Sequence, residues 1–452
     1  MNTAIPSAET SPLLTDLYQL NMMQTYLDKG ETGTAVFEFF PRRLPARRGF
    51  LLAAGLETAL DFIEGLRFSP EEIAWLENTG RFRRNLIDYL ANYRFSGDVH
   101  AIPEGTAVFG EEPMLRVTAP LPQAQLLESR LVNILHYQTV VASKAARMVL
   151  AADGKLLLDF GMRSAHGAEA GLLAARASYI AGFAGTATVL AGMRFGIPIA
   201  GTMAHSFVLA HDSEEQAFED FARSRPDSVI LLIDSYDTIA GAHKTVALAR
   251  RLKAEGIVVR GVRIDSGNLI ELSKQVRAIL DAGDMTEVQI FVSGGVDEDR
   301  LATFAGAGAP IDGVGIGTSL TVSPDAPTID CAYKLQDYNG VARRKRSVGK
   351  ETWPGRKQVW RETGADGRMR GDILSVDGDT QPGERLVVPM MQAGRRLAPS
   401  PSLEVLRRRA AASLAALPEP LRRLDPDFRY PVTPAERLKR LADEVDARSA
   451  AL

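Results

Sequence analysis

One histidine of this chain, His205, lies in the segment "GTMAHSF", directly after an apolar run and a Gly-Thr turn. An imidazole at such a place can pack as a structural residue, bind a metal, act as a general base or act as a nucleophile. His211 follows six residues later, and this spacing does not place both rings on one helix face for joint zinc binding. The sequence has no HExxH pattern and no GxxxxGK[ST] loop, so if a nucleoside triphosphate is used, something other than a P-loop must hold it.

Two glycine-rich segments follow apolar runs late in the chain. The first is "SGG", with Gly294 and Gly295, and the second is "GVGIGT", with Gly315, Gly317 and Thr318. Such turns present backbone N–H groups, and a helix that follows adds the positive end of its dipole. Glycine also serves plain tight turns, but two consecutive segments of this kind favour a phosphate-binding site.

Two arginines, Arg163 and Arg263, follow other apolar runs and have carboxylates nearby in the sequence. Arginine binds a phosphate or a carboxylate through two parallel hydrogen bonds. For either residue alone, a structural Arg–Asp pair is the alternative. Beside two glycine-rich turns, the two cations predict an anionic, polyphosphorylated substrate.

The elements that must position these residues are short apolar runs that alternate with helical patterns between residues 155 and 320. Apolar strands joined by helices predict a parallel sheet that is covered on both faces. We expect a (β/α) barrel, whose chemistry lies on the loops after the strands, with a doubly wound open sheet as the alternative. The ends of these runs carry Asp159, Phe160, Arg163, Thr202, His205, Asp234, Arg263, Asp265, Ser266, Gly294, Gly295, Gly315, Gly317 and Thr318.

The first 120 residues mix helix and strand patterns. Residues 15–29 predict a helix with Thr15 as N-cap and Gly30 as its stop, and residues 97–118 predict a small antiparallel sheet. A long helix is expected from about 122 to 151. We therefore expect an N-terminal α/β domain, a barrel and a C-terminal segment that packs on both, with bounds 1–120, 121–335 and 336–452.

The composition excludes several classes of protein. The net charge of −3 over 452 residues provides no basic surface for nucleic acid, and the run "RRKR" is most simply a solvated turn. Cys331 is the single cysteine, so the chain forms no internal disulfide. The first 20 residues lack the features of a signal peptide, and no apolar run reaches membrane-spanning length. We expect a cytoplasmic protein that binds neither nucleic acid nor a membrane.

The chain resembles the nicotinate phosphoribosyltransferase family over most of residues 11–361, with the matching segments in the family's order. The resemblance implies an α/β fold, a decorated (β/α) barrel with an added N-terminal α/β domain, like that of type II phosphoribosyltransferases. It also implies a homodimer with shared active sites. The matching segments are "LLTDLYQLNMMQTYL", "FEFFPRRLP", "GFLLAAGLE", "IPEGTAVFGEEPMLRV", "DFGMRSAHG", "GIPIAGTMAHSFV", "GVRIDSGNL", "VSGGVDE", "VGIGTSL", "YKL" and "GKETWPGRKQVWR".

The resemblance also implies an activity. The family joins nicotinate to 5-phosphoribosyl 1-diphosphate (PRPP), giving nicotinate mononucleotide and pyrophosphate for NAD biosynthesis. ATP hydrolysis is coupled to this step through a phosphohistidine, with Mg²⁺ accompanying ATP and PRPP. His205 matches the phosphorylated histidine, and either Asp234 or Asp265 is expected to orient its ring.

Other roles follow from the same resemblance. Tyr18 and Phe160 match the aromatic pair that sandwiches the pyridine ring, and flat rings stack well on aromatic faces. Asp265 matches a catalytic carboxylate near the ribose hydroxyls. The further nicotinate-side positions are Arg163, Thr202 and Arg263, and the positions for the phosphoribosyl group are Ser266, Gly294, Gly295, Gly315, Gly317 and Thr318.

The chain departs from the family pattern at Ala187, in the segment "GTAT". Many family members have "GTSN" there, and related nicotinamide-using enzymes have "GTDT", whose aspartate faces the amide. Ala187 offers no acceptor for an amide, so we expect the acid to be the substrate. The alternatives are a quinolinate-type phosphoribosyltransferase and a non-catalytic phosphosugar-binding barrel.

Overall fold

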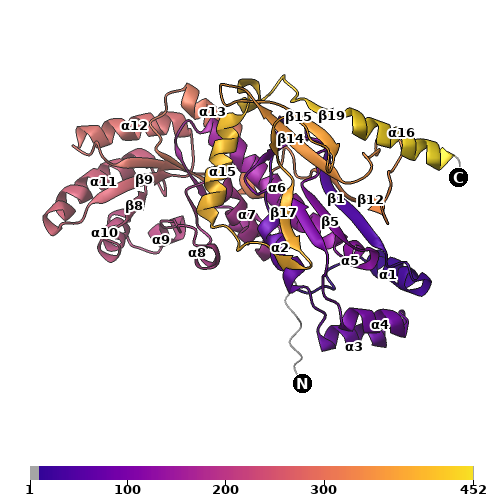
Figure 1. Cartoon of the computed structure of the whole chain (residues 1–452). Helices are drawn as coiled ribbons and strands as arrows, with labels where there is room; N and C mark the ends of the chain where they lie inside the picture. The colour runs from indigo at the N-terminus through magenta and orange to yellow at the C-terminus, as the bar shows by residue number, and fades with distance from the viewer. Residues whose placement is uncertain (1–9, 451–452) are drawn as a thin grey trace. The chain divides into compact units, whose positions relative to one another are not determined.

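The computed structural model describes residues 10–450, which divide into two compact units (Figure 1). Unit 2 comprises residues 144–324, and unit 1 contains the described residues on both sides of it. The first break lies within the long helix α6 (Glu128–Ala151), and the second follows α14 (Thr318–Val322). Residues of the predicted first and third segments therefore lie together in unit 1.

Unit 2 is built on a parallel sheet whose strand order is β7-β6-β11-β10-β9-β8. All neighbouring strands are parallel, and a bridge from Thr186 to Ile199 extends the sheet beyond β7. The sheet is therefore a half-barrel, and the prediction of an α/β barrel-type fold is confirmed. The strands are β6 (Leu156–Asp159), β7 (Gly185–Thr186), β8 (Val229–Leu232), β9 (Val259–Ile264), β10 (Gln289–Val292) and β11 (Gly313–Ile316).

Helices with a side-chain cap follow three of the six strands of this sheet. Asp237, Asn268 and Asp297 each accept a backbone hydrogen bond at the start of the helix that follows β8, β9 or β10. These caps keep the intervening loops short and hold the strand-end residues near the sheet edge. The helices of unit 2 beyond α6 and α14 are α7 (Ala168–Ala181), α8 (Val189–Phe195), α9 (His205–Leu209), α10 (Glu214–Ser224), α11 (Thr238–Leu252), α12 (Leu269–Ala282) and α13 (Glu298–Gly306).

Unit 1 contains a seven-stranded sheet of order β13-β12-β1-β5-β3-β17-β18. Its inner strand β1 (Thr34–Arg43) pairs antiparallel with β5 (Leu115–Pro120) and with β12 (Asp330–Tyr338). The remaining strands of this sheet are β3 (Asp98–Ala101), β13 (Val341–Ala342), β17 (Val388–Gln392) and β18 (Arg395–Arg396), and a two-stranded sheet pairs β2 (Leu51–Leu52) with β4 (Ala107–Val108). A third sheet joins β16 (Glu384–Arg385), β14 (Lys357–Thr363), β15 (Met369–Val376) and β19 (Val432–Pro434).

The predicted first helix is confirmed as α1 (Leu17–Lys29), and Gly30 ends it in the left-handed conformation at φ +69°. The predicted N-cap is wrong, because Asp16 rather than Thr15 occupies that position. The predicted helix 122–151 is divided into α5 (Leu121–Leu126) and α6. The other helices of unit 1 are α2 (Leu56–Gly65), α3 (Pro70–Asn78), α4 (Arg84–Ala91), α15 (Leu403–Ala416) and α16 (Glu436–Ala450).

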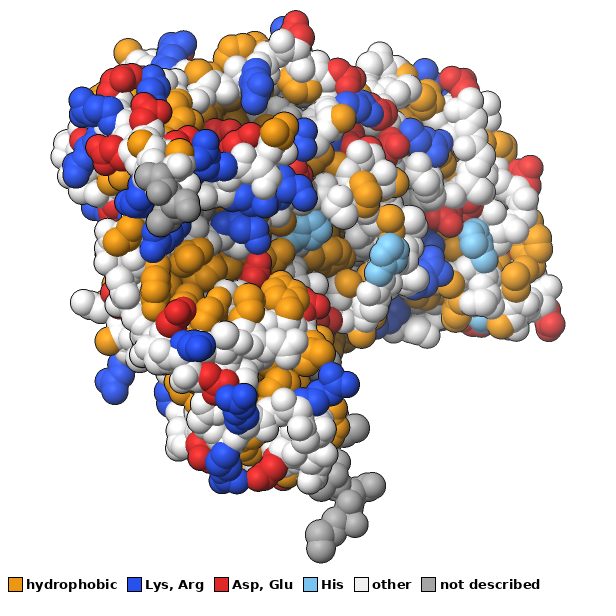
Figure 2. All heavy atoms as spheres, turned by 90° about the vertical axis from the view of Figure 1, so that its right-hand side faces the viewer, with side chains coloured by type: hydrophobic (Ala, Val, Ile, Leu, Met, Phe, Trp, Pro, Cys, Tyr) orange, Lys and Arg blue, Asp and Glu red, His pale blue; other side chains and the backbone are white. Residues whose placement is uncertain are grey.

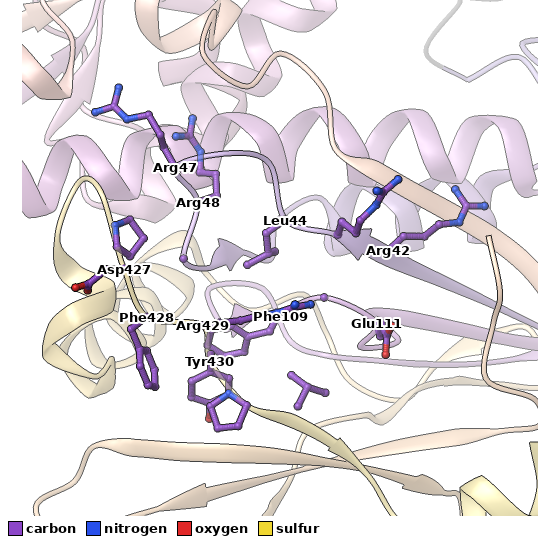
Figure 3. A pocket seen from close by; sticks show the side chains of 16 residues that line it. Arg42, Leu44, Arg47, Arg48, Phe109, Glu111, Asp427, Phe428, Arg429 and Tyr430 are labelled. Carbon is purple, nitrogen blue, oxygen red and sulfur yellow. The ribbon is translucent and has the colours of Figure 1, made fainter. Parts of the chain in front are cut away.

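The basic turn at residues 42–48, which begins within the last residues of β1, borders a cavity of about 680 Å³ in unit 1 (Figure 3). Its arginines are neutralised by acids from the later part of the chain. Arg42 and Arg43 pair with Asp330, and the pairs Arg47–Asp425 and Arg48–Asp325 have N–O distances of 2.6 Å. In Figure 3 the side chains of Arg42, Arg47 and Arg48 point away from the rings of Phe109 and Tyr430. These two rings stack with their centroids 3.7 Å apart. The turn therefore joins the early and late segments of unit 1.

The face shown in Figure 2 carries both acidic and basic side chains, interspersed among hydrophobic and other groups, in keeping with the net charge of −3. Within the run "RRKR", Arg344 and Arg346 pair with Asp446 of α16. None of the helices between residues 10 and 450 combines the length and the apolar composition needed to cross a bilayer.

Candidate active site

His205 is the first residue of α9 and lies at the carboxyl edge of the half-barrel. Its Nδ1 is 3.0 Å from the hydroxyl oxygen of Ser235. Its Nε2 faces two carboxylates, at 4.0 Å from Asp234 Oδ1 and 3.8 Å from Asp265 Oδ2. The ring is thus held between a hydroxyl on one nitrogen and two negative charges on the other. This arrangement suits an imidazole that takes up positive charge during a reaction.

The two carboxylates beside His205 differ in their surroundings. The side chain of Asp234 is 1% exposed, and its Oδ2 accepts from the backbone N–H of Asp265 at 2.8 Å and the hydroxyl of Ser266 at 2.7 Å. Its Oδ1 has no hydrogen-bond partner among the described residues and faces the imidazole. The side chain of Asp265 is 37% exposed and accepts from the hydroxyl of Ser293. Asp234 is therefore a fixed charge, whereas Asp265 is open to a ligand.

Arg263 joins β9 to the segment that precedes His205. It donates to the hydroxyl of Thr202 and to the carbonyl of Met203, both at 2.9 Å. Burial lowers the pKa of Arg263, while Asp265 and Asp234 act in the opposite direction. Neither Arg263 nor Arg163 forms an ion pair with a carboxylate of residues 10–450, so a structural Arg–Asp pair explains neither of them.

A cavity of about 290 Å³ opens inside the half-barrel next to these residues. Its walls are mostly apolar, and Arg263 is the single charged residue that lines it. A small flat molecule that carries one anionic group would match this lining. The lining residues are Leu156, Leu158, Phe160, Ala184, Ala200, Gly201, Thr202, Ile230, Arg263, Phe291, Val292 and Gly315.

The predicted glycines lie at the ends of β10 and β11, and close packing explains part of their presence. A Cβ on Gly315 would lie 2.3 Å from the ring of Phe160, and one on Gly294 would lie 2.2 Å from the carbonyl oxygen of Asp265. Gly294 also has φ +89°. Arg300 of α13 donates to the carbonyls of Gly294 and Gly295 at 3.3 and 3.1 Å, which leaves the N–H groups of this turn for a ligand.

The loop after β6 carries Phe160 and Arg163. Arg163 is exposed and lies in a short 3₁₀ turn, Met162–Ser164. The hydroxyl of Ser164 is 2.7 Å from that of Thr318, so this turn is tied to the glycine-rich loop after β11. Gly317 precedes Thr318, and a Cβ there would lie 3.1 Å from the carbonyl oxygen of Phe160. The predicted nicotinate-side and phosphate-side positions therefore meet at this point.

The structure brings most of the predicted positions together at one edge of unit 2. Tyr18 lies on α1 of unit 1, where its side chain is 47% exposed, and its contact with a bound ring stays a prediction. Sequence reasoning missed Ser235, which contacts His205, and Ser293, which contacts Asp265. A signal was present in both cases, because each serine directly follows an apolar strand or a strand-end carboxylate in the sequence.

The part of the chain that the structure describes offers no preformed metal site. Within residues 10–450, no three His, Cys, Asp or Glu side chains come together in a way that would hold a metal ion. Magnesium bound with nucleotide or sugar phosphates needs only one or two protein carboxylates, because the phosphates and water supply the other ligands. The open carboxylate of Asp265 fits that lesser requirement.

Comparisons with known proteins assign the chain to a family. The N-terminal domain model of nicotinate phosphoribosyltransferase matches residues 13–136, and the model of the nicotinate phosphoribosyltransferase family matches residues 156–353. The chain is 47% identical to nicotinate phosphoribosyltransferase pncB2 of Mycobacterium tuberculosis, over 94% of this chain and 92% of that protein. It is 40% identical to nicotinate phosphoribosyltransferase of Bacillus subtilis, over 77% and 72%.

A solved structure agrees with these sequence matches. The crystal structure of human nicotinic acid phosphoribosyltransferase superposes with a TM-score of 0.86 at 29% identity, covering 95% of this chain and 99% of that one. The matched part of the chain includes residues of both units. The chain therefore belongs to the nicotinate phosphoribosyltransferase family.

Proposed function

We propose that the protein joins nicotinate to PRPP, giving nicotinate mononucleotide and pyrophosphate, as its relatives' names indicate. The observation that carries this proposal is the apolar cavity with Arg263 as its single charged lining residue, next to the His205 cluster. One cation matches the one carboxylate of nicotinate. Quinolinate carries two carboxylates and would need further cations in the same cavity, so the quinolinate-type alternative is disfavoured.

In this proposal the pyridine ring lies against Phe160, with its carboxylate toward Arg263. The pyridine nitrogen attacks C1 of the ribose as the bond from C1 to the diphosphate oxygen breaks, and pyrophosphate leaves with the bonding electrons. In the same proposal the partly exposed carboxylate of Asp265 stabilises positive charge on the ribose in the transition state. The N–H groups after β10 and β11 would hold the 5-phosphate.

We further propose that ATP phosphorylates His205 on Nδ1. The Nε2 side faces Asp234 and Asp265, so the ring proton belongs on Nε2 and the lone pair on Nδ1. The γ-phosphoryl group forms a bond to Nδ1 as its bond to ADP breaks, and the imidazole takes up positive charge. The fixed carboxylate of Asp234 offsets that charge. Ser235 lies 3.0 Å from the attacking nitrogen and can hydrogen-bond an incoming phosphoryl oxygen. Mg²⁺ would enter with the phosphates of ATP and PRPP, beside Asp265.

We also propose how the protein assembles and where it is located. A homodimer in which Tyr18 of one subunit covers the nicotinate of the other agrees with the exposure of that side chain on α1. We propose a cytoplasmic enzyme with domain bounds 1–120, 121–335 and 336–452 and with small-molecule partners only. The mixed surface charge supports the absence of a nucleic-acid role.

A direct test follows product formation with purified protein. Nicotinate, nicotinamide and quinolinate are each supplied with PRPP and Mg²⁺, with and without ATP, and nucleotide and pyrophosphate are measured. We expect product from nicotinate, faster with ATP, and far less from the other two compounds. Turnover of quinolinate with release of carbon dioxide, or no turnover of nicotinate, would contradict the proposed function.

A further inference from the structure

A buried carboxylate, Asp159, ends β6 directly before Phe160 and is 1% exposed. It accepts from the backbone N–H of Gly161 at 2.8 Å and from the hydroxyl of Thr186 at 2.7 Å. Thr186 ends β7 and is also fully buried, and its hydroxyl oxygen accepts from the backbone N–H of Thr188 at 3.0 Å. The backbone carbonyl of Asp159 accepts from Ala187 at 2.8 Å. The bonds from Thr186 and Ala187 join the loops that follow β6 and β7, and the other two lie within one loop each.

The joined loops fix the position of Phe160. Its backbone N–H donates to the carbonyl of Ile316 at 2.8 Å, and its ring lies so close to Gly315 that a Cβ there would approach it to 2.3 Å. The ring therefore lies against β11, and the backbone of Phe160 follows directly on the turn that the Asp159 carboxylate ties to β7. Since Phe160 lines the cavity and Asp159 does not, the carboxylate acts on the cavity only through its neighbours.

Packing alone does not account for an acid at this position. A buried carboxylate costs free energy that an apolar side chain of similar size would not, even when hydrogen bonds satisfy it. Burial raises the pKa of Asp159, while the hydrogen bonds from Thr186 and Gly161 act to lower it. A carboxylate instead provides directional hydrogen bonds, because it accepts from one donor in the loop after β6 and from one at the end of β7.

We propose that Asp159 and Thr186 are positioning residues for nicotinate, which hold the ring of Phe160 and the loop of Ala187 at the pyridine end of the cavity. This inference deepens the proposed function and rests on it. The pair touches no substrate. Its loss would let the Phe160 ring move away from the stacking position, so nicotinate would bind more weakly while the His205 end of the site stays intact.

The test compares Thr186→Val, Asp159→Asn and the double variant in steady-state kinetics. Each single change should raise the KM for nicotinate about tenfold or more. The KM of the double variant should be no higher than that of the more impaired single variant. The KM for PRPP and the acid-labile labelling of His205 by ATP should change less than twofold. Thr186→Ser, which keeps the hydroxyl, should restore the KM for nicotinate to within about twofold of the original.

The matched control is Asp312→Asn. Asp312 directly precedes β11, at the amino-terminal end of the strand, and accepts from the backbone N–H of Ile290 in β10 at 2.7 Å; its change should leave the KM for nicotinate unaltered. The inference is overturned if folded Thr186→Val keeps the original KM, or if the KM values for nicotinate and PRPP and the labelling deteriorate together. If Asp159→Asn fails to fold, Thr186→Val and Thr186→Ser decide alone. Absence of nicotinate turnover in the unmodified protein would reject the proposed function instead.

Discussion

Changing Asp234 to asparagine should slow the phosphorylation of His205 about a hundredfold. Asp234 Oδ1 lies 4.0 Å from Nε2 of the imidazole. Two unit charges at that distance attract by about 1 kcal/mol in water and by about 4 kcal/mol at an effective dielectric constant of about 20. The Asp234 side chain is 1% exposed and that of His205 is 39% exposed, so an intermediate value applies. About 2.7 kcal/mol corresponds to a hundredfold change in rate.

The asparagine also acts on the tautomer of the ring. Its carbonyl would take the place of Oδ2, which accepts from Asp265 and Ser266, and its NH₂ group would then face His205 Nε2. A donor at that position favours a lone pair on Nε2 and a proton on Nδ1, which is the wrong tautomer for attack from Nδ1. This effect adds to the lost attraction and has the same sign.

The assay is incorporation of acid-labile phosphate from γ-labelled ATP in a rapid-quench experiment, without nicotinate and PRPP. Asp265→Asn is the matched control, because its carboxylate is at 3.8 Å but is 37% exposed and therefore screened. We expect less than a tenfold change in labelling for the control. Labelling of Asp234→Asn at the original rate, or a larger loss in Asp265→Asn, would refute the assignment of Asp234 as the orienting carboxylate.

Three further predictions concern other parts of the chain. Ala187→Asp should raise the KM for nicotinate at least tenfold, because a like charge would face the carboxylate; an unchanged KM in steady-state assays would contradict this. Mixing Tyr18→Ala subunits with His205→Asn subunits should restore part of the activity if sites are shared, and activity at parental level after confirmed exchange would reject sharing. Burial and Asp372 raise the pKa of Glu112 well above its ordinary value of 4.5. The contribution of this carboxyl group to folding stability is therefore full below pH 4.5, and it declines as the pH rises through the folded-state pKa. Glu112→Gln should therefore gain thermal stability relative to the unmodified protein between pH 5 and pH 8, and parallel Tm curves would rule this out.

The half-barrel was predictable because its strands consist of continuous runs of apolar residues. "SVILLID" and "VQIFVSGG" mark β8 and β10 within a residue or two, and each ends in the polar or glycine residues that the fold gathers at one edge. Periodicity and strand-end chemistry are local properties, so they can be read without the structure. The same holds for Gly30, whose position after a helical pattern predicts the observed helix end.

Features that depend on distant residues were not predictable. Nothing in the sequence indicates that β12 pairs with β1, since their paired residues Phe37 and Leu335 lie about three hundred positions apart. The choice between Asp234 and Asp265 depends on burial and on which oxygen is already occupied, which only the packed structure shows. The hydrogen bond from Thr186 to Asp159 could not be predicted for the same reason, because it joins two loops across neighbouring strands.

We propose that His205 accepts the phosphoryl group and so couples ATP to nucleotide formation. The most direct test is acid-labile labelling of His205→Asn by γ-labelled ATP, with His211→Asn as the control and circular dichroism to verify folding. We predict no labelling and no ATP hydrolysis in His205→Asn, and original labelling in His211→Asn, whose imidazole bonds within its own helix turn at 2.7 Å from the carbonyl of Phe207. Full labelling of folded His205→Asn would contradict the account.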